Sequence, residues 1–591
     1  MTCGSSNSRW WSGSSPSWAS IRRWTGSRSW PNASGSPPRS RRAPRAGDSP
    51  RGKEPSSPEP HPAHRPERED VVPARTGKQY LDNLASLDPE IYLNGRRIRH
   101  VTEEPVFAGP LRTVAEQYDL QLDPRYVDVC TYESPTTGER LSRSFQPCRS
   151  KEDLVAKRRH FKLRADHTFG MMGRSPDFMN AFVLGWSNNA HIFGELDARF
   201  GENARRYYEH VRDHDLFLTH VLINPAIDRS KTSSQQEDPF LHLGKVRETD
   251  EGIVVRGAKM LSTMAPFAEE LVVVPFGGIA PGDDDYAVVF AVPIDTPGLK
   301  FICREPVAPA GRTEFDHPLS SRFEEMDCIA VFDDVLVPWD RVVVDGRPGS
   351  RDLVNRVLGN DPSVLVVNAC RSLASVELLC GVATKIADAT GIDNFLHVQE
   401  KLGDLLARLD TLRTLFHGAE ALAAPLPDGT WVPYMPGLMA FHMQTAPTHR
   451  RMVEVIQILA AGNFFYAPSG GDFANEELRP FIDRFVRGRP GVSAEERVRL
   501  FKLAWDVAGD GFGQRLMQYV HYYSGDPVRL TAALYLSADK TEIHRTVERA
   551  LAGSERSLDI PVSPERLEMA PPPPPTKPLT GMYPAKSQPS S

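Results

Sequence analysis

Polar side chains that could bind a ligand follow a short apolar stretch near the middle of the chain. Residues 219–231 read T-H-V-L-I-N-P-A-I-D-R-S-K, and the apolar start of this stretch is typical of a buried strand. The Asn-Pro pair then turns the backbone out of the strand, with His220 before the turn and Asn224, Asp228 and Arg229 in the loop. Such loops often carry binding sites, although an ordinary strand end with solvated charges has the same pattern.

Several other kinds of site lack their usual motif. The chain has no G-x-x-x-x-G-K-[ST] phosphate loop, no H-E-x-x-H zinc motif and no G-x-S-x-G nucleophile elbow. Residues 509–513 (G-D-G-F-G) match a dinucleotide fingerprint only in part, and they lie in a helical region rather than after a strand. We therefore expect no metal site, and any nucleotide cofactor must be held by other means.

The elements that would position these residues fall into three parts. A capping box at Thr76 and Gln79 begins the ordered chain, a hairpin is expected around Asn94-Gly95, and residues 151–217 are mostly helical. Residues 174–178 (R-S-P-D-F) predict a helix with proline at its first position. Short apolar runs separated by turns predict strands at 252–257, 271–274, 287–292 and 328–336.

Helical patterns return after about residue 351. Leucines and a valine at three- and four-residue steps over 397–416 predict one apolar helix face that packs in the core. Residues 436–461 predict a second helix, bent at Pro447, and residues 495–523 predict a third. The expected fold class is α+β, with an N-terminal helical domain, a middle β-barrel-like domain and a C-terminal helical bundle.

The expected domain bounds are 1–74 for a disordered extension, 75–218, 219–346 and 347–566 for the three domains, and 567–591 for a disordered tail. Residues 1–74 are rich in Ser, Arg, Pro and Gly and hold five of the nine tryptophans without periodicity. This extension is read as a disordered tail, an organelle transit peptide or sequence upstream of the true start, and its prolines disfavour the transit peptide. The proline run after Leu567 predicts a disordered tail.

Composition excludes some functions. The chain has 591 residues and a net charge of -6, which gives no reason to expect nucleic acid as a partner. Its seven cysteines are scattered without C-x-x-C spacing, so we expect neither a disulfide framework nor a four-cysteine zinc site, and the pattern suits a reducing cytoplasm. No apolar run reaches the roughly 18 residues that span a bilayer, and no membrane partner is expected.

Five segments in this order resemble one family. They are R-S-P-D-F (174–178), T-H-V-L-I-N-P-A-I-D-R-S-K (219–231), G-A-K-M-L-S-T-M-A-P (257–266), D-H-P-L-S-S-R-F-E-E-M-D (316–327) and F-D-D-V-L-V-P-W-D-R-V (332–342). Together they resemble the 4-hydroxyphenylacetate 3-hydroxylase family, over roughly residues 75–561. Within it, the pyoverdin-chromophore hydroxylase branch looks closest.

The resemblance implies a fold, a reaction and partners. Family members have the acyl-CoA dehydrogenase fold and take reduced FAD (FADH2) from a separate flavin reductase. They react it with O2 to a flavin C4a-hydroperoxide and place one oxygen ortho to a phenolic hydroxyl. A small phenolic substrate, a homodimer or homotetramer and a cytoplasmic location are therefore expected here.

The resemblance also assigns roles to residues. It implies that Arg174 and His220 contact the phenolic oxygen, where a guanidinium stabilises phenolate charge and an imidazole shares the proton. A helix-end ion pair for Arg174 and a satisfied core histidine for His220 are the alternatives. Phe178 stands where the best-known members have Tyr, so a phenolic donor to the substrate is missing. We therefore expect a phenol other than free 4-hydroxyphenylacetate.

The remaining residues concern flavin and access. The flavin-binding candidates are Asn224, Ala226, Ile227, Asp228, Arg229 and Thr263 near the ring, and Tyr466, Ala467, Pro468 and Ser469 near the nucleotide, with Gln514 and Arg515 as helpers. Residues 276–285, including the substrate-binding candidates Phe276 and Gly277, are expected to form a lid, or else a simple hairpin loop. The lid would shield the flavin from water.

Three other functions fit the same fold less well. A dehydratase with an iron–sulfur cluster needs clustered cysteines, and none lies near Arg174. An acyl-CoA dehydrogenase needs a carboxylate base and a CoA groove, and the motifs do not match that branch. A protein that binds flavin without turnover remains the third alternative.

Overall fold

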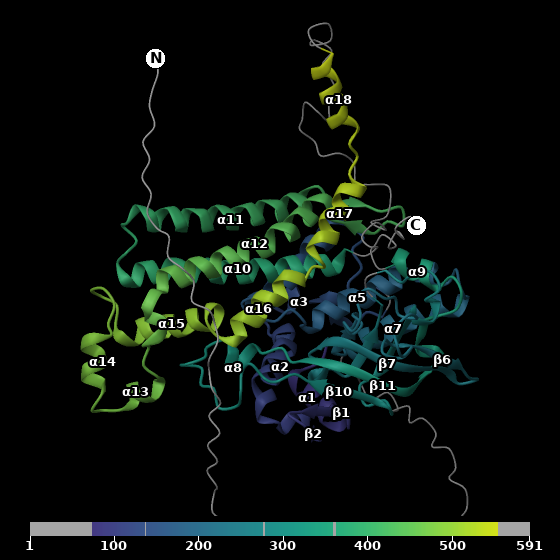
Figure 1. Cartoon of the computed structure of the whole chain (residues 1–591), viewed down its shortest axis with the longest axis horizontal. Coiled ribbons are helices and arrows are strands. Elements are labelled where there is room, and N and C mark those ends of the chain that lie inside the picture. Colours follow the sequence, from purple (N-terminus) through teal and green to yellow (C-terminus); the bar gives the residue numbers. More distant parts are fainter. Residues whose placement is uncertain (1–73, 136, 276–277, 358–361, 553–591) are drawn as a thin grey trace, which may run out of the picture. The chain divides into compact units, whose positions relative to one another are not determined.

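The computed structural model describes residues 74–552 except 136, 276–277 and 358–361 (Figure 1). The terminal segments predicted to be disordered, residues 1–74 and 567–591, lie outside the described residues except for Ala74. The first helix, α1 (Gly77–Ser86), begins at the predicted capping box, where the Thr76 side chain accepts from the Gln79 backbone N–H. Ala74 and Arg75 just before it are already buried.

Four longer helices follow α1 in the N-terminal part. They are α2 (Ala108–Leu122), α4 (Lys151–His167), α5 (Pro176–Asn188) and α7 (Ala198–His214). Helix α5 starts at Pro176 as predicted, with Ser175 as N-cap. The predicted hairpin forms between β1 (Glu90–Leu93) and β2 (Arg96–Ile98). It extends the large sheet of the middle part, because β1 pairs in parallel with β10.

Two sheets make up the middle part. The larger has the strand order β2-β1-β10-β11-β7-β6, and the smaller has the order β12-β9-β8-β5. The strands after the hairpin are β5 (Leu218–Val221), β6 (Gly244–Glu248), β7 (Gly252–Thr263), β8 (Glu270–Val273), β9 (Val288–Pro293), β10 (Leu299–Cys303), β11 (Asp327–Pro338) and β12 (Val342–Asp345). The four predicted apolar runs fall on β7, β8, β9 and β11. Their buried side chains pack with those of the helices in one hydrophobic core.

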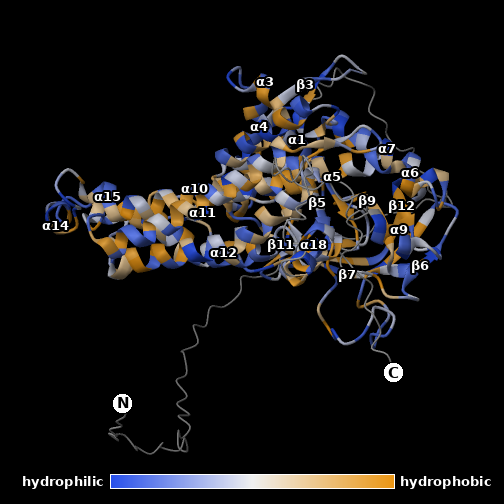
Figure 2. Cartoon of the chain, turned by 90° about the horizontal axis from the view of Figure 1, so that it is seen from above, coloured by the Kyte–Doolittle hydropathy of each residue, from blue (hydrophilic) through white to orange (hydrophobic). Residues whose placement is uncertain are grey.

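The C-terminal part is built on three long helices that lie side by side (Figures 1 and 2). They are α10 (Ser363–Thr390), α11 (Leu396–Ala421) and α12 (Met435–Ala460), the last with Pro447 inside it. The predicted α11 stripe is buried at Leu405, Leu409 and Leu412, whereas Leu406 is exposed. Leu406 lies at the edge of the stripe. Consecutive residues of a helix point in different directions, so Leu405 and Leu406 cannot both face the core.

The predicted helix over 495–523 is two helices, α15 (Ala494–Ala508) and α16 (Gly511–Tyr522). The break falls at Gly509-Asp510, where the Asp510 carboxylate accepts from the Gly511 N–H and caps the second helix. The glycine-rich 509–513 segment is therefore a corner between two helices, and it does not follow a strand as a dinucleotide-binding loop would.

Smaller elements complete the description. They are α3 (Val127–Cys130), α6 (Ala190–Phe193), α8 (Ser320–Phe323), α9 (Ser350–Val357), α13 (Gly470–Ala474), α14 (Arg479–Phe485), α17 (Pro527–Ser537), α18 (Thr541–Leu551) and the pairs β3 (Thr131–Glu133) with β4 (Arg140–Ser142) and β13 (Ala424–Pro425) with β14 (Trp431–Val432). One expectation needs correction: α10 is long and apolar enough to cross a membrane, but 72% of its most apolar window is buried within the protein. This burial is typical of a core helix in a soluble protein.

Candidate functional site

Arg174, Phe178 and His220 meet at the start of α5. The guanidinium carbon of Arg174 lies 3.9 Å from the centre of the Phe178 ring, and the ring centres of Phe178 and His220 are 5.5 Å apart. Arg174 has no ion pair among the described residues, so the alternative of a helix-end salt bridge fails. The structure therefore brings together Arg174, Phe178 and His220, three of the five residues predicted to bind the phenol.

The His220 imidazole is buried and lacks a hydrogen-bond partner. It lies on β5, and neither ring nitrogen has a partner among the described residues. Burial, with a smaller contribution from the Arg174 charge, lowers the pKa of His220 well below 6.5. The imidazole is therefore neutral near pH 7, and it is not the satisfied core histidine of the alternative. A neutral ring can accept a proton from a bound hydroxyl group.

Two tyrosines that the sequence analysis did not single out complete this group. The Tyr519 and Tyr523 rings of α16 and its C-cap lie 5.5 and 5.0 Å from the Arg174 guanidinium carbon. The Tyr523 hydroxyl donates to the Gly173 carbonyl at 2.8 Å, whereas the Tyr519 hydroxyl has no partner in the described part of the chain. Their four-residue spacing on a helix was the available signal, but the same spacing is common in ordinary core packing.

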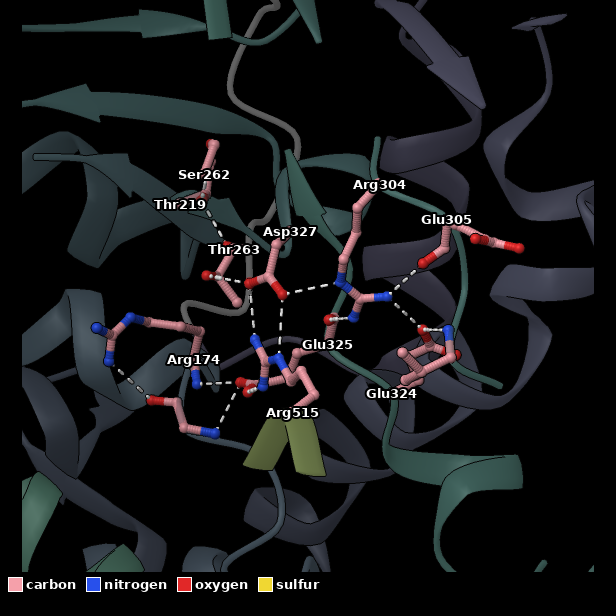
Figure 3. A network of polar contacts seen from close by, with 12 residues as sticks. Arg174, Thr219, Ser262, Thr263, Arg304, Glu305, Glu324, Glu325, Asp327 and Arg515 are labelled. Carbon is pink, nitrogen blue, oxygen red and sulfur yellow. Dashed lines mark hydrogen bonds and ion pairs between the residues drawn. The ribbon is translucent and has the colours of Figure 1, made fainter. Parts of the chain in front are cut away.

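Thr263 is connected to Arg174 through a buried ionic network (Figure 3). The Thr263 hydroxyl donates to Asp327 at 2.7 Å, and Asp327 also accepts from Arg515 of α16 at 2.7 Å. Arg515 donates to Glu325 at 2.6 Å, and Glu325 in turn accepts from the backbone N–H of Arg174 at 2.6 Å. One network thus joins the N-terminal helices, the sheet and the bundle.

The network fixes the charges of its carboxylates. Burial alone would raise the pKa of Asp327, but the charges of Arg515 and Arg304 outweigh it and hold the pKa at about 2. Asp327 is therefore ionised and can keep Thr263 in one orientation. Arg515, expected only as a helper at the nucleotide, is the central residue of this network.

The loop after β5 is held by a buried lysine. Lys259 on β7 donates to the Leu222 carbonyl at 3.2 Å and to the Asn224 side-chain oxygen at 2.9 Å. Burial lowers the pKa of Lys259 to about 7. The loop beyond Asn224 is more exposed: Ala226, Ile227 and Arg229 face outwards, and the Asp228 carboxylate accepts from the Ser230 N–H at 3.0 Å.

This surface fits the ring of a flavin. Ile223, Ile227 and Leu261 expose 39–52% of their area near Asn224 and Thr263, although large apolar side chains are usually buried. The backbone takes a positive φ at Leu261 and Met264, on both sides of Thr263. A flat aromatic ring would cover the apolar side chains, while the hydroxyl and amide groups would face its polar edge.

The other predicted cofactor residues lie apart from this group. Tyr466 contacts Asn463 and Arg497, and Ser469 caps α13 with Asp472 in a capping box. Ala467 packs on a small separate cluster around Phe473. None of the contacts of Tyr466–Ser469 among the described residues reaches Arg174, His220 or Thr263. Within one chain, no hydrogen bond or ring contact of the described residues therefore joins the two segments that are predicted to bind the flavin.

The predicted lid is described only in part. Phe276 and Gly277 lie outside the described residues. Further along the same loop, the Asp283 carboxylate accepts from the backbone N–H of Ser233 at 2.9 Å and of Ser234 at 3.3 Å. The predicted lid segment is thereby attached to the loop that follows Asn224.

Three possible metal ligands gather elsewhere, although no metal motif was found in the sequence. The ligand atoms of His317, Asp506 and Asp510 lie within 4.8 Å of one another. Their carboxylates already have partners: Asp506 accepts from two backbone N–H groups of residues 319–320, and Asp510 pairs with Arg312. We interpret this cluster as the anchor of the segment around α8.

Comparison with known proteins identifies the family. The family models for the N-terminal and C-terminal parts of 4-hydroxyphenylacetate 3-hydroxylase match residues 76–344 and 364–552. The 4-hydroxyphenylacetate 3-monooxygenase oxygenase component of Thermus thermophilus is 40% identical over 462 residues, 78% of this chain and 94% of that protein. The pyoverdin chromophore biosynthetic protein PvcC of Pseudomonas aeruginosa is 34% identical over 474 residues, 78% and 92% of the two chains.

A solved structure agrees with these matches. The crystal structure of a 4-hydroxyphenylacetate 3-monooxygenase oxygenase component, HpaB, complexed with FAD and 4-hydroxyphenylacetate superposes with a TM-score of 0.77 at 39% identity. The alignment covers 82% of this chain and all of that one. The expected α+β fold, with helical, β and helical parts in this order, is thus confirmed. This chain belongs to the 4-hydroxyphenylacetate 3-hydroxylase family of FAD-dependent monooxygenase oxygenase components.

Proposed function

We propose that this protein hydroxylates a small phenol ortho to its hydroxyl group, using O2 and reduced FAD delivered by a separate flavin reductase. The observation that supports this most directly is the group of Arg174, Phe178 and His220. It offers a buried aromatic surface, an unpaired cation and a neutral imidazole without partners at one place. Phenol hydroxylation needs these three features, because the ring must be held while its hydroxyl group loses a proton.

Each side chain has a role in this reaction. Phe178 stacks on the substrate ring, and the His220 imidazole accepts the phenolic proton, for which its lowered pKa keeps it unprotonated. Arg174 then stabilises the phenolate oxygen, whose charge makes the ortho carbon electron-rich. Its guanidinium lies over Phe178 here, so it moves aside when a substrate ring takes that place.

Reduced FAD supplies the electrons that activate O2, and Asn224, Ala226, Ile227, Asp228, Arg229 and Thr263 would hold its ring. Tyr466, Ala467, Pro468 and Ser469 are proposed to bind the nucleotide part. Since they lie apart from Thr263 in one chain, we propose that they serve the flavin of a second copy. Phe276 and Gly277 would close over the substrate, because water must be kept from the activated oxygen.

The test supplies chemically reduced FAD, O2 and a panel of para-substituted phenols, and measures product mass and H2O2 together. We expect a catechol product with at least one phenol, and a loss of more than tenfold in Arg174→Gln and His220→Gln. Release of H2O2 equal to the reduced flavin consumed, with no catechol from any phenol, would contradict the proposal and leave a flavin-binding protein.

We also propose that the protein is a cytoplasmic homodimer or homotetramer. Three phenylalanines at the outer end of the bundle, Phe465, Phe481 and Phe485, expose 63–83% of their area. Exposed aromatic side chains of this size mark interaction surfaces. Light scattering after gel filtration should give a multiple of the chain mass, and Phe481→Glu with Phe485→Glu should lower it. A monomer at micromolar concentration would contradict this assembly.

A further inference from the structure

One arginine of the bundle, Arg371, is buried without a hydrogen-bond or ion-pair partner among the described residues. Arg371 lies on α10 and is 2% exposed. Its Nε, Nη1 and Nη2 atoms all lack a hydrogen-bond partner among the described residues. A guanidinium does not lose its proton in proteins, and a buried one is normally paired with a carboxylate. Arg371 therefore places an uncompensated positive charge inside the protein.

Arg371 lies beside the candidate site. Its guanidinium carbon is 5.6 Å from the Tyr519 ring centre and 5.0 Å from the Tyr523 ring centre. The Arg174 guanidinium carbon also lies 5.0 Å from the Tyr523 ring centre, so the two carbons are separated by no more than twice this distance. The segment before Arg174 also touches α10, since a Cβ added at Gly170 would meet the Arg371 carbonyl at 2.3 Å.

No nearby carboxylate neutralises Arg371. The charged and titratable groups around it are Arg174, Glu325, His449, Arg515, Tyr519 and Tyr523. Glu325 already accepts from two backbone N–H groups and from Arg515, and Asp327 is bound by Arg515 and Arg304. His449 is neutral, because burial and then the Arg371 charge lower its pKa to about 3.

Other buried polar groups near Arg371 also lack hydrogen-bond partners. The Tyr519 hydroxyl, the Ser375 hydroxyl one helix turn from Arg371, and the His449 Nε2 atom are all buried and unpaired among the described residues. The described part of the site thus holds two guanidinium groups without an ion pair, whereas Glu325 and Asp327 are both paired. A bound anion would supply the negative charge that these two guanidinium groups lack.

We propose that Arg371 is a specificity-determining residue whose uncompensated charge makes the site bind its phenolic substrate in the ionised form, as the phenolate. This inference rests on the proposed function, because the phenolate is the anion that Arg174 holds. Arg371 acts through its electrostatic field without touching the substrate, because the Tyr519 and Tyr523 rings lie between it and Arg174. The Arg371 and Arg174 guanidinium carbons lie at most about 10 Å apart. A charge about 10 Å from a phenolate held by Arg174 would shift its ionisation by about one pKa unit at an effective dielectric constant of about 20.

A coloured phenol tests this without turnover. The full-length protein with oxidised FAD is titrated with 4-nitrophenol from pH 5 to pH 9, and the yellow band of the nitrophenolate reports the ionised fraction of the bound ligand. We expect the wild-type protein to bind the nitrophenolate, with a pKa below that of the free ligand. Arg371→Gln should raise the bound pKa by about one unit, and Arg371→Lys should restore most of the difference.

A matched control separates a local effect from a general one. Arg413 on α11 is half-exposed and pairs with Glu377 at 2.9 Å, so Arg413→Gln removes the same charge away from the site and should leave the bound pKa unchanged. Circular dichroism checks folding of each variant. An equal bound pKa in wild type and Arg371→Gln would overturn the role of Arg371 while leaving the proposed function standing. Failure of the wild type to bind any phenol would instead overturn the proposed function.

Discussion

Phe178 is the residue at which we expect this chain to differ from the best-known members of its family. Its ring lies between Arg174 and His220, and it offers stacking surface but no hydroxyl group. Of these three side chains, only the guanidinium and the imidazole can form a hydrogen bond with the phenolic oxygen of a substrate. We therefore expect the substrate preference to depend on the hydrogen bond that Phe178 cannot donate to the phenolic oxygen.

Phe178→Tyr should shift that preference. The added hydroxyl can donate to the phenolic oxygen, and one neutral hydrogen bond contributes about 1 kcal/mol, or roughly fivefold in kcat/KM. We expect the ratio of kcat/KM for 4-hydroxyphenylacetate to that for bulkier phenols to rise by this factor. The measurement is product formation over a phenol panel, with Phe182→Tyr on the same helix as control. An unchanged ratio would show that residue 178 does not select the substrate.

Lys259 provides a prediction about pH. Its pKa is about 7 in the folded protein and 10.5 in the unfolded chain, so the unfolded chain binds more protons between these values. The free energy of unfolding of the wild type should therefore rise with pH from 7 to 10.5, relative to Lys259→Met. Denaturant melts of both proteins at several pH values give the difference. Parallel pH curves would mean that Lys259 has an ordinary pKa.

At the scale of elements, α16 is the helix on which the site depends. It carries Arg515 of the ionic network and Tyr519, which lies beside both Arg174 and Arg371. Its first turn packs tightly against the end of α15. A Cβ added at Gly513 would lie 2.5 Å from the Val507 backbone, whereas one added at Gly511 would make only ordinary contacts.

Two alanine variants in this turn should therefore differ. Gly513→Ala should lower the free energy of unfolding by about 1–3 kcal/mol, because the backbone must move to admit the methyl group. Displacement of α16 should also weaken 4-nitrophenol binding. Gly511→Ala, two residues earlier, should be nearly neutral in both measurements. Equal effects of the two variants would show that the corner between α15 and α16 is not rigid.

At the scale of the whole molecule, the described residues begin at Ala74. Arg75 connects this first segment to the sheet. The Arg75 guanidinium pairs with Glu269 and donates to the Tyr118 hydroxyl at 3.2 Å, all in the interior. The ionic network at Arg515 joins the three parts in the same way. Buried ion pairs thus connect segments that lie far apart in the chain.

Two truncations test where the functional chain begins. A chain starting at Val71 should keep full activity and the wild-type unfolding midpoint, because it keeps Arg75. A chain starting at Gly77 leaves Glu269 without its guanidinium partner, although Asn83 still contacts it, and should lose about 3–5 kcal/mol. Thermal unfolding and the hydroxylation assay measure both. Loss of activity in the Val71 chain would give residues 1–70 a role.

The sequence by itself determined the family, the order of helical, β and helical parts, the start of α5 and the strand that carries His220. These rest on short-range signals: capping residues, turn residues, apolar periodicity and contiguous motifs. Only the tertiary structure decided that Tyr519 and Tyr523 lie beside both Arg174 and Arg371, since Tyr523 and Gly173 are 350 positions apart in the chain. It also decided that Tyr466–Ser469 lie away from Thr263. No local pattern encodes such contacts, because they depend on how whole helices pack against the sheets.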